Sequence, residues 1–134
     1  MPITLDGALG IHEQAVKLRA QRAELLATNL ANADTPNYRA RDIDFKAALT
    51  SAQAAGQGSP PLAATHAGHL QHGAGGINPS LLLYRNPHQA SLDGNTVDTQ
   101  VEQAEFAQNA LHYMASLTFL SGKISGLMSA IKGE

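Results

Sequence analysis

The stretch that decides the fold is LATNLANADTPNYRARDIDF, residues 26–45. It begins as an amphipathic helix, with two leucines one turn apart. Pro36 removes a backbone donor and disfavours the helical conformation at Thr35, so we expect the helix to end by about Asp34. Pro36 and Asn37 then fit the two central positions of a tight turn. The sequence therefore predicts a helix that stops and reverses direction here.

The chain after this turn is predicted to be extended and then helical. Tyr38 to Arg41 read as extended chain, with both arginines on one side. Asp44 can cap a short helix with the sequence FKAALTSAQAA, residues 45–55. Before the turn, Asn32 tolerates the left-handed conformation that often ends a helix. Taken alone, the stretch is a helix stop with a reversal.

A long helix is predicted over residues 9–33, and its apolar residues form two stripes on nearly opposite sides. The two stripes are Leu9, Val16, Ala23 and Leu30, and Ile11, Leu18 and Leu25. A helix on the surface of a globule needs only one apolar face. Two faces indicate a helix that lies between neighbours.

A second long helix is predicted from near residues 96–99 to about Lys132. Thr99 and Glu102 have the spacing of a capping box, and Asn95 or Asp98 can serve as the cap instead. Its first apolar face consists of Val97, Val101, Ala104, Leu111, Ala115 and Phe119. Its second face consists of Phe106, Ala110, Tyr113, Leu117, Ile124, Met128 and Ile131. The narrow polar wedge that remains holds Glu105, Asn109, His112 and Ser116.

These patterns predict a mainly α fold, in which long N- and C-terminal helices pack as a coiled-coil-like pair. An irregular middle segment with short extended or β pieces joins them. The predicted divisions are residues 1–34 for the first helix, 35–95 for the middle and 96–134 for the second helix. Within the middle, residues 56–76 are a flexible Gly/Pro-rich connector, and the run of three leucines and a tyrosine at 81–84 is predicted to be a strand or an extended packing segment.

Composition narrows the classes of function. The chain has 134 residues, a net charge of −2 and no cysteine, which argues against nucleic-acid binding and excludes disulfide or thiolate chemistry. Aromatic residues make up only 4%, so a well-packed independent core is doubtful. The N-terminus lacks the basic and apolar regions of a secretory signal, and residues 106–122 read as too polar to span a membrane. Composition alone would place the protein in the cytoplasm.

Two motifs carry a resemblance to a known family. NLANADTPNYRARDIDF at 29–45 resembles the N-terminal signature of bacterial flagellar rod and hook proteins. DGNTVD at 93–98 and ALHYMASLTFLSGKISGL at 110–127 resemble the C-terminal helix of proximal-rod members of that family. The residues that match the signature are Asn29, Leu30, Ala31, Asn32, Thr35, Pro36 and Tyr38. Asn37 replaces the glycine of many relatives, and asparagine also accepts a positive φ, so we expect the turn to survive.

The resemblance implies a structural subunit of the flagellar basal-body rod that self-assembles and transmits torque, without catalysis and without a cofactor. The implied partners are copies of itself, other rod proteins such as FlgC, the MS-ring/rod adapter FliE and the flagellar type III export gate. It also implies a place in the rod, which spans the periplasm, and export without a cleaved signal peptide. This overrides the cytoplasmic location that composition suggests.

The family resemblance also implies an export motif at FKAAL, with Phe45 and Leu49 read by the export gate. Spacing alone gives another interpretation, an apolar pair one turn apart that docks a short helix. The export interpretation and the docking interpretation are both possible if the segment is exposed before assembly and buried afterwards. We assign the face with Phe106, Ala110, Tyr113, Leu117 and Ile124 to neighbouring subunits. We assign the stripe with Val101, Ala104, Leu111 and Ala115 to the protein's own N-terminal helix.

The alternative function is a small metal-binding domain built on His66, His69 and His72. These histidines lie in the Gly-rich connector, and no Asp or Glu occurs between Phe45 and Leu92 to support a metal site. Glu102 and Glu105 read as lone surface carboxylates in the first turns of a helix. A membrane-associated amphipathic protein is a third alternative, weakened by the lack of flanking basic clusters. The sequence shows no recognisable active site, metal site or stable membrane insertion.

Overall fold

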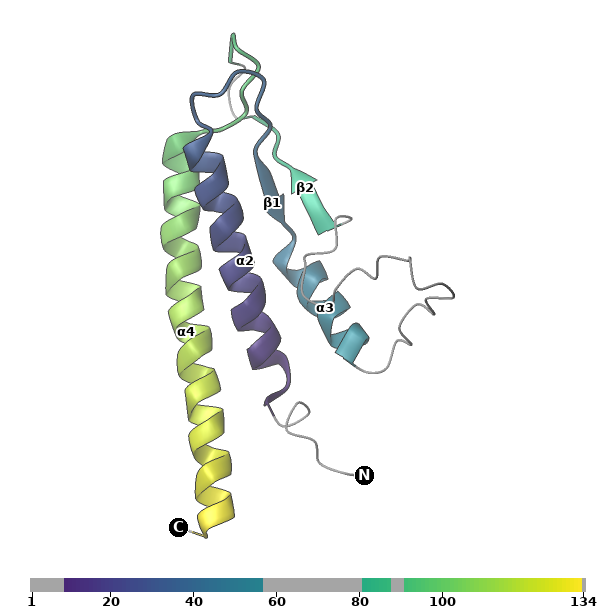
Figure 1. Ribbon diagram of the computed structural model, residues 1–134, viewed down its shortest axis with the longest axis vertical. Helices are drawn as coiled ribbons and strands as arrows, with labels where there is room; N and C mark the ends of the chain where they lie inside the picture. Colours follow the sequence, from purple (N-terminus) through teal and green to yellow (C-terminus); the bar gives the residue numbers. More distant parts are fainter. Residues whose placement is uncertain (1–8, 57–80, 88–90, 134) are drawn as a thin grey trace, which may run out of the picture.

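The computed structural model describes residues 9–56, 81–87 and 91–133. Its elements in chain order are helix α2 (Ile11–Ala31), strand β1 (Arg41–Ile43), helix α3 (Phe45–Gly56), strand β2 (Leu82–Tyr84) and helix α4 (Thr99–Lys132). Helices α2 and α4 run side by side, and α4 continues well beyond the start of α2 (Figure 1). The predicted mainly α fold, with long terminal helices around an irregular middle, is confirmed.

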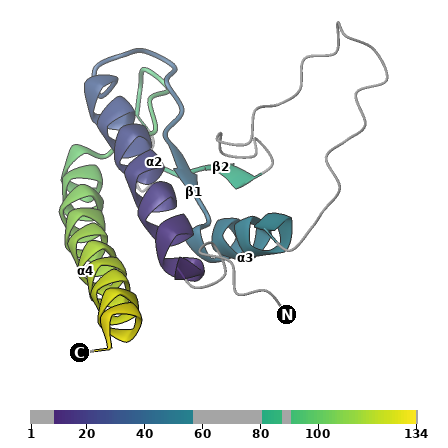
Figure 2. The ribbon, with the colours of Figure 1, turned by 60° about the horizontal axis from the view of Figure 1, so that its bottom comes forward.

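Helix α2 lies between two layers of the same chain. It contacts α4 on one side and α3 and β1 on the other (Figure 2). Leu18 and Leu26 are buried along it, at 8% and 0% exposure. The two apolar stripes predicted a helix between neighbours, and both neighbours are supplied within the subunit.

The reversal after α2 follows the predicted turn, with one difference. The amide of Tyr38 donates to the carbonyl of Thr35 over 3.3 Å, which places Pro36 and Asn37 at the centre of the turn. Asn37 has φ 59, as its role in place of glycine requires. Asn32, which tolerates the left-handed conformation, does not adopt it and has φ −105. Its side chain instead donates to the carbonyl of Thr28 over 2.8 Å, which satisfies the helix end without a left-handed residue.

The middle segment contributes a two-stranded antiparallel sheet. β1 pairs with β2 in the register Arg41 with Tyr84, Asp42 with Leu83 and Ile43 with Leu82. The strand predicted at 81–84 is therefore confirmed as β2. Directly after β1, the Asp44 carboxylate accepts a hydrogen bond from the amide of Ala47 at 3.0 Å, so Asp44 caps α3 as predicted.

Of the three residues that the sequence left open as the N-cap of α4, Asp98 is the one that caps it. Its carboxylate accepts from the amides of Gln100 and Val101 at 3.0 and 3.3 Å. The helix ends at Lys132, as predicted, and Gly133 follows in the left-handed conformation with φ 76. Glu102 does not complete a capping box, because its carboxylate is directed toward α2 and Arg85.

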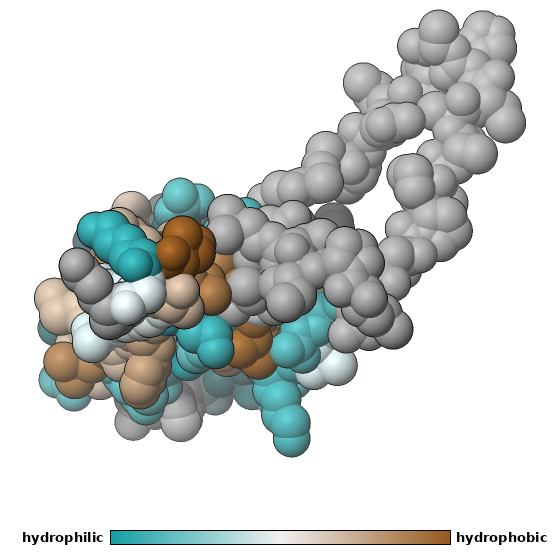
Figure 3. All heavy atoms as spheres, turned by 90° about the horizontal axis from the view of Figure 1, so that it is seen from below, coloured by the Kyte–Doolittle hydropathy of each residue, from teal (hydrophilic) through white to brown (hydrophobic). Residues whose placement is uncertain are grey.

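The apolar core of the described residues is small. Its buried apolar side chains are Leu18, Leu26, Ala40, Ile43 and Ala48. The buried polar side chains are almost as numerous, namely Asn29, Asn95, Glu102 and Asn109. Viewed from the end where α4 finishes, apolar patches remain on the surface beside hydrophilic ones (Figure 3). Polar contacts therefore carry an unusual share of the tertiary structure.

The face of α4 that meets α2 differs from the predicted one. Leu111 is 69% exposed, and Ala104 and Ala115 are exposed as well, so most of the stripe assigned to the N-terminal helix faces solvent; only Val101 is half-buried. Glu102 and Asn109 lie against α2 instead, each 1% exposed. The prediction failed because it treated polar side chains as outward-facing, whereas α2 presents polar groups that bind them.

By length and composition, α4 is apolar enough to cross a membrane. This corrects the exclusion drawn from sequence, which considered residues 106–122 alone, whereas the helix that is long and apolar enough is Thr99–Lys132. Exposed apolar side chains along α4 produce this property. One such helix is weak evidence for a membrane span, because helices that pack against protein pass the same test.

Some predictions lie outside the described residues. His66, His69 and His72 belong to this group, as does the connector beyond Gly56. Within the described ranges, no three His, Cys, Asp or Glu side chains are grouped to hold a metal ion.

The contact between Asn95 and the signature turn generates a stability prediction. The Asn95 amide group lies 3.0, 2.7 and 3.0 Å from the carbonyl oxygens of Asn32, Ala33 and Thr35. Asn95→Ala leaves these carbonyls without that donor, so we expect a loss of about 1–3 kcal/mol in unfolding free energy. Urea unfolding followed by circular dichroism measures it. Asn86→Ala, at an exposed asparagine, is the matched control. Equal effects of the two substitutions would contradict the structural role of Asn95.

Candidate functional site

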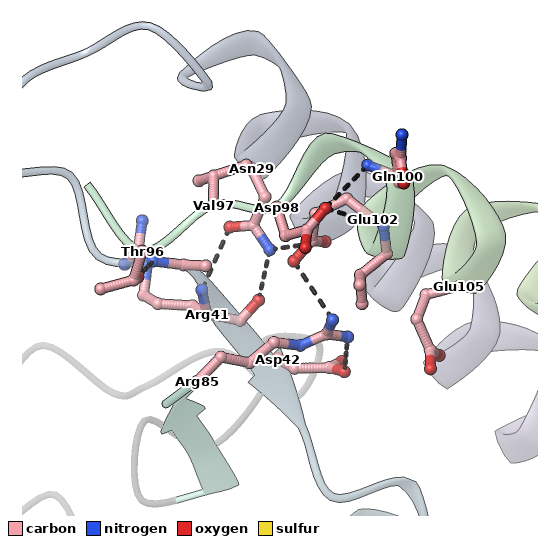
Figure 4. Close-up of polar contacts among 12 residues, drawn as sticks. Asn29, Arg41, Asp42, Arg85, Thr96, Val97, Asp98, Gln100, Glu102 and Glu105 are labelled. Carbon is pink, nitrogen blue, oxygen red and sulfur yellow. Dashed lines mark hydrogen bonds and ion pairs between the residues drawn. The ribbon is translucent and has the colours of Figure 1, made fainter. Parts of the chain in front are cut away.

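Asn29, the first residue of the signature, is the centre of a polar junction between α2, β1 and α4 (Figure 4). Its amide group donates to the carbonyl of Arg41 at 2.8 Å and to Glu102 at 3.1 Å. Its oxygen accepts from the amide of Arg41 at 3.1 Å and from the Tyr38 hydroxyl at 3.3 Å. Both hydrogens and both lone pairs of the amide are used. No other side chain of this size offers two donors and two acceptors without charge.

Asn95 makes the second junction, between the two motifs that carry the family resemblance. Besides its contacts to the turn carbonyls, its oxygen accepts from the amide of Val97 at 2.8 Å. The neighbouring Thr96 hydroxyl accepts from the amide of Ala40 at 2.8 Å. The amide of Asn37 donates to the carbonyl of Asp93 at 2.8 Å. The segment before α4 therefore holds the turn after α2 directly.

A network of charged side chains extends from the Asn29 junction. Arg22 binds Asp42 through two hydrogen bonds of 2.9 and 2.8 Å, and Glu105 through a third of 2.8 Å. Arg85 pairs with Asp42 and, at 3.2 Å, with Glu102. Two guanidinium groups thus join three carboxylates from β1 and α4. Because Arg22 and Arg85 share Asp42, the pairs form one network rather than isolated surface bridges.

The network sets the ionisation of its members. Burial opposes the charged form of Asp42, but hydrogen bonds from Arg22, Arg85 and the amide of Ile43 outweigh it and hold the pKa of Asp42 below its ordinary value. For Arg22, the hydrogen bond to Asp42 outweighs the effect of burial, and the pKa of Arg22 rises above its ordinary value. Both groups therefore remain charged at neutral pH.

Glu102 and Glu105 are not the lone surface carboxylates that the sequence suggested. The Glu102 side chain is 2% exposed and contacts Asn29 and Arg85, while Glu105 pairs with Arg22. Sequence reasoning missed the pairing because the partners are distant in the chain. One signal was present in the spacing, since Arg22 lies four residues from both Leu18 and Leu26, which are buried on the same helix. A charged residue between buried leucines indicates a partner.

The other signature residues lie around the two junctions or at the tip of the reversal. Leu30, Asn32 and Tyr38 are half-buried. Ala31, Thr35 and Pro36 are exposed. The side chains that hold the junctions together are supplied by Asn29 and Tyr38 of the signature and by Asn95 outside it, whereas Asn32 contributes its backbone carbonyl. The remaining matches shape the turn.

The predicted export residues are half-buried where α3 meets α2. The guanidinium carbon of Arg19 lies 3.8 Å from the centre of the Phe45 ring, a cation–π contact. Ala48, between Phe45 and Leu49, is 2% exposed. In the folded subunit this segment is part of the α2–α3 contact, as the spacing alone predicted. Its role in export stays a prediction.

The residues predicted for assembly border the α2–α4 contact. Phe106, Leu117 and Ile124 are 39%, 40% and 41% exposed. Ala110 and Tyr113 are half-buried and, with Phe106, line a groove of about 290 Å³ whose other walls are Ala20, Ala23 and Asn109. The groove is mainly apolar, and the charged network is occupied by its own pairs. This arrangement is suited to holding and docking protein surfaces.

Comparison with known proteins agrees with the two motifs. The family model described as flagella basal body rod protein matches residues 9–39. A flagellar basal body rod protein FlgB of Aeromonas hydrophila is 50% identical, and the alignment covers 100% of this chain and 99% of the relative. A FlgB of Cereibacter sphaeroides is 54% identical, with 94% of each chain covered. A FlgB of Escherichia coli is 47% identical, with 96% and 95% covered.

The charged network generates a prediction about pH. Because the folded-state pKa of Asp42 is lowered, its contribution is present above the unfolded pKa of about 4 and is lost as pH falls through the folded value. Asp42→Asn should lower the unfolding free energy by on the order of 2 kcal/mol at pH 7. The difference from the native protein should shrink below about pH 4. Urea unfolding across this pH range measures both effects.

Asp34→Asn, at an exposed carboxyl of the turn, is the control and should change stability little at any pH. A difference between Asp42→Asn and the native protein that stays constant down to low pH would contradict the role of the ionised Asp42.

Proposed function

The chain belongs to the FlgB family of flagellar basal body rod proteins, and from this we propose that it is a structural subunit of the proximal rod, which self-assembles with other rod proteins and transmits torque. The observation that carries the proposal is the surface of α4. The helix packs on α2 along one side, and most of its large apolar side chains remain outside that contact.

The exposed apolar surface supports assembly. Along α4, large apolar side chains with at least about two-fifths exposure are Leu111, Met114, Leu117, Phe119, Ile124, Met128 and Ile131. Exposed apolar patches larger than those usual on a monomer mark sites of contact with other proteins. The residues occur on several sides of the helix, which suits a subunit with neighbours in more than one direction.

The junctions support the transmission of torque. Asn29, Arg22 and Asp42 fix the angle between the helical pair and the strand segment through hydrogen bonds rather than through a large apolar core. Directional bonds resist shear between elements, whereas apolar contact is non-directional. A shaft that turns under load requires subunits whose elements do not slide.

The finer assignments rest on the family relationship. We propose FlgC and further rod proteins, the adapter FliE and the export gate as partners, and a place in the rod that spans the periplasm. Export would proceed without a cleaved signal peptide, through Phe45 and Leu49. We propose no enzymatic activity, no cofactor and no stable membrane insertion, since the apolar surface of α4 is used in assembly. The histidines of the alternative metal-binding domain lie outside the described residues.

The export role predicts that Phe45→Ala reduces secretion while synthesis stays normal. The gate would read Phe45 before α3 docks on α2, so loss of the ring removes the recognised group. Immunoblots of cell and periplasmic fractions from a strain that carries the variant measure it. Phe119→Ala removes a ring that is 64% exposed on α4 and should be secreted normally. Normal periplasmic amounts of Phe45→Ala would remove the export role.

The assembly role predicts that Leu117→Asp is folded and exported but absent from the rod. Leu117 is 40% exposed, so aspartate should lower the unfolding free energy of the monomer by about 1–2 kcal/mol through lost apolar burial, whereas a buried unpaired charge in the assembled contact costs several kcal/mol. Leu111→Asp should likewise leave the monomer folded, because Leu111 faces solvent. Purified basal bodies and monomer unfolding provide the two measurements.

Gln108→Asp, at an exposed polar position of α4, is the control that should enter basal bodies normally. Leu117→Asp in basal bodies at native amount would show that the assigned face is wrong.

A further inference from the structure

Helix α3 lies against the first half of α2 through a narrow apolar stripe (Figure 2). The residues of α3 that are not exposed, among 45–54, are Phe45, Ala48, Leu49 and Ala52, which share one face of the helix. Only Ala48 is buried, at 2% exposure, and alanine contributes little apolar surface. A helix of 12 residues is marginal by itself. The attachment of α3 therefore depends on what covers this stripe.

Arg19 of α2 covers the ring of Phe45. Its guanidinium carbon lies 3.8 Å from the centre of the ring, so the cation sits over the ring face. The backbone carbonyl of Arg19 accepts a hydrogen bond of 2.9 Å from the Asn109 side chain. Arg19 thus contacts α3 with its side chain and α4 with its backbone. Substitution of the side chain alters the contact with α3 and leaves the bond to α4 in place.

The cover on Phe45 has an unfavourable component. Nε of Arg19 is buried and has no hydrogen-bond partner within the described ranges. Burial, and after it the charge of Arg22, lowers the pKa of Arg19 below its ordinary value. A buried donor without a partner opposes the packing that buries it. At the Asn29 junction, by contrast, both donors and both acceptors of the amide are used. The attachment of α3 is therefore weaker than that junction.

We propose that α3 detaches from α2 while the rest of the subunit stays folded, and that Arg19 sets how often Phe45 is uncovered. Detachment separates the ring from the guanidinium and returns both groups to water. Openings of this kind occur at a lower free energy than global unfolding. The inference rests on the proposed role of Phe45 in secretion and names the residue that regulates access to it.

Amide hydrogen exchange of the purified full chain measures the detachment. We expect residues 46–54 to be protected, but to exchange through a smaller opening than residues 26–31 beside the Asn29 junction. Arg19→Met keeps a side chain over the ring and removes the unpartnered donor, and methionine sulfur also contacts aromatic rings favourably. It should slow exchange over 46–54 by on the order of 3- to 10-fold and leave 26–31 unchanged.

Two further variants keep this test specific. Arg19→Ala removes the side-chain stem as well as the charge, so the ring loses its cover and exchange over 46–54 should become faster. Methionine and alanine are both good helix formers, so α2 itself is preserved. Arg39→Met is the matched control, because its guanidinium carbon lies 4.9 Å from the centre of the Tyr84 ring, outside the α2–α3 contact. It should leave exchange over 46–54 unchanged.

Several results of the exchange measurement would overturn the detachment of α3. One is a native protein in which residues 46–54 are unprotected, and another is exchange of 46–54 and 26–31 through the same opening. Equal effects of Arg19→Met and Arg39→Met would also overturn the role of Arg19.

Secretion separates this inference from the proposed export role. A strain that carries Arg19→Met should secrete less protein than the native strain at unchanged synthesis, although Phe45 and Leu49 are intact. Normal secretion of Arg19→Met, with exchange over 46–54 slowed, would overturn the regulatory role of Arg19. The export role still stands in that case if Phe45→Ala is secreted poorly. Normal secretion of Phe45→Ala would overturn the export role, while the exchange measurement still decides whether α3 detaches.

Discussion

The hydrogen bonds of Asn29 are the constraint on which the rest of the structure depends. This side chain joins α2 to β1 through both backbone groups of Arg41 and joins α2 to α4 through Glu102. The apolar core is too small to fix these elements by itself, since only five apolar side chains in the described residues are buried. Any packing of α2, β1 and α4 that separated Asn29 from these partners would leave its fully buried amide without hydrogen bonds. Such packing is therefore disfavoured.

The charged network adds specificity to this junction. A buried ion pair often contributes little net stability, because desolvation offsets the attraction, but breaking one partner is costly. Arg22, Asp42 and Arg85 therefore act mainly against wrong registers of the helices and strands, each of which would separate a charge from its partner. The same reasoning applies to Glu102 and Asn109, which point toward α2 at positions where apolar residues would permit the helices to slide.

The small apolar core of the subunit goes together with a large number of exposed apolar side chains. A subunit that fixes its own fold with polar contacts can leave its large apolar side chains for other proteins. Leu111, Phe119 and Ile131 of α4 remain exposed at 69%, 64% and 85%. Under the proposed rod function, this surface would contact neighbouring subunits. The side chains that hold the subunit together are largely distinct from those that α4 leaves exposed.

Local features could be predicted from the amino-acid sequence, because their causes lie within a few residues. The helix α2 ends before Pro36, Asn37 takes a positive φ, and Asp44 caps its helix. Only the tertiary structure decided which side of α4 meets α2. Glu105 and Arg22 are 83 residues apart, and Asn29 and Glu102 are 73 apart. Local periodicity treats such polar residues as solvent-exposed, since the partner that makes their burial favourable is supplied only when the distant segments pack together.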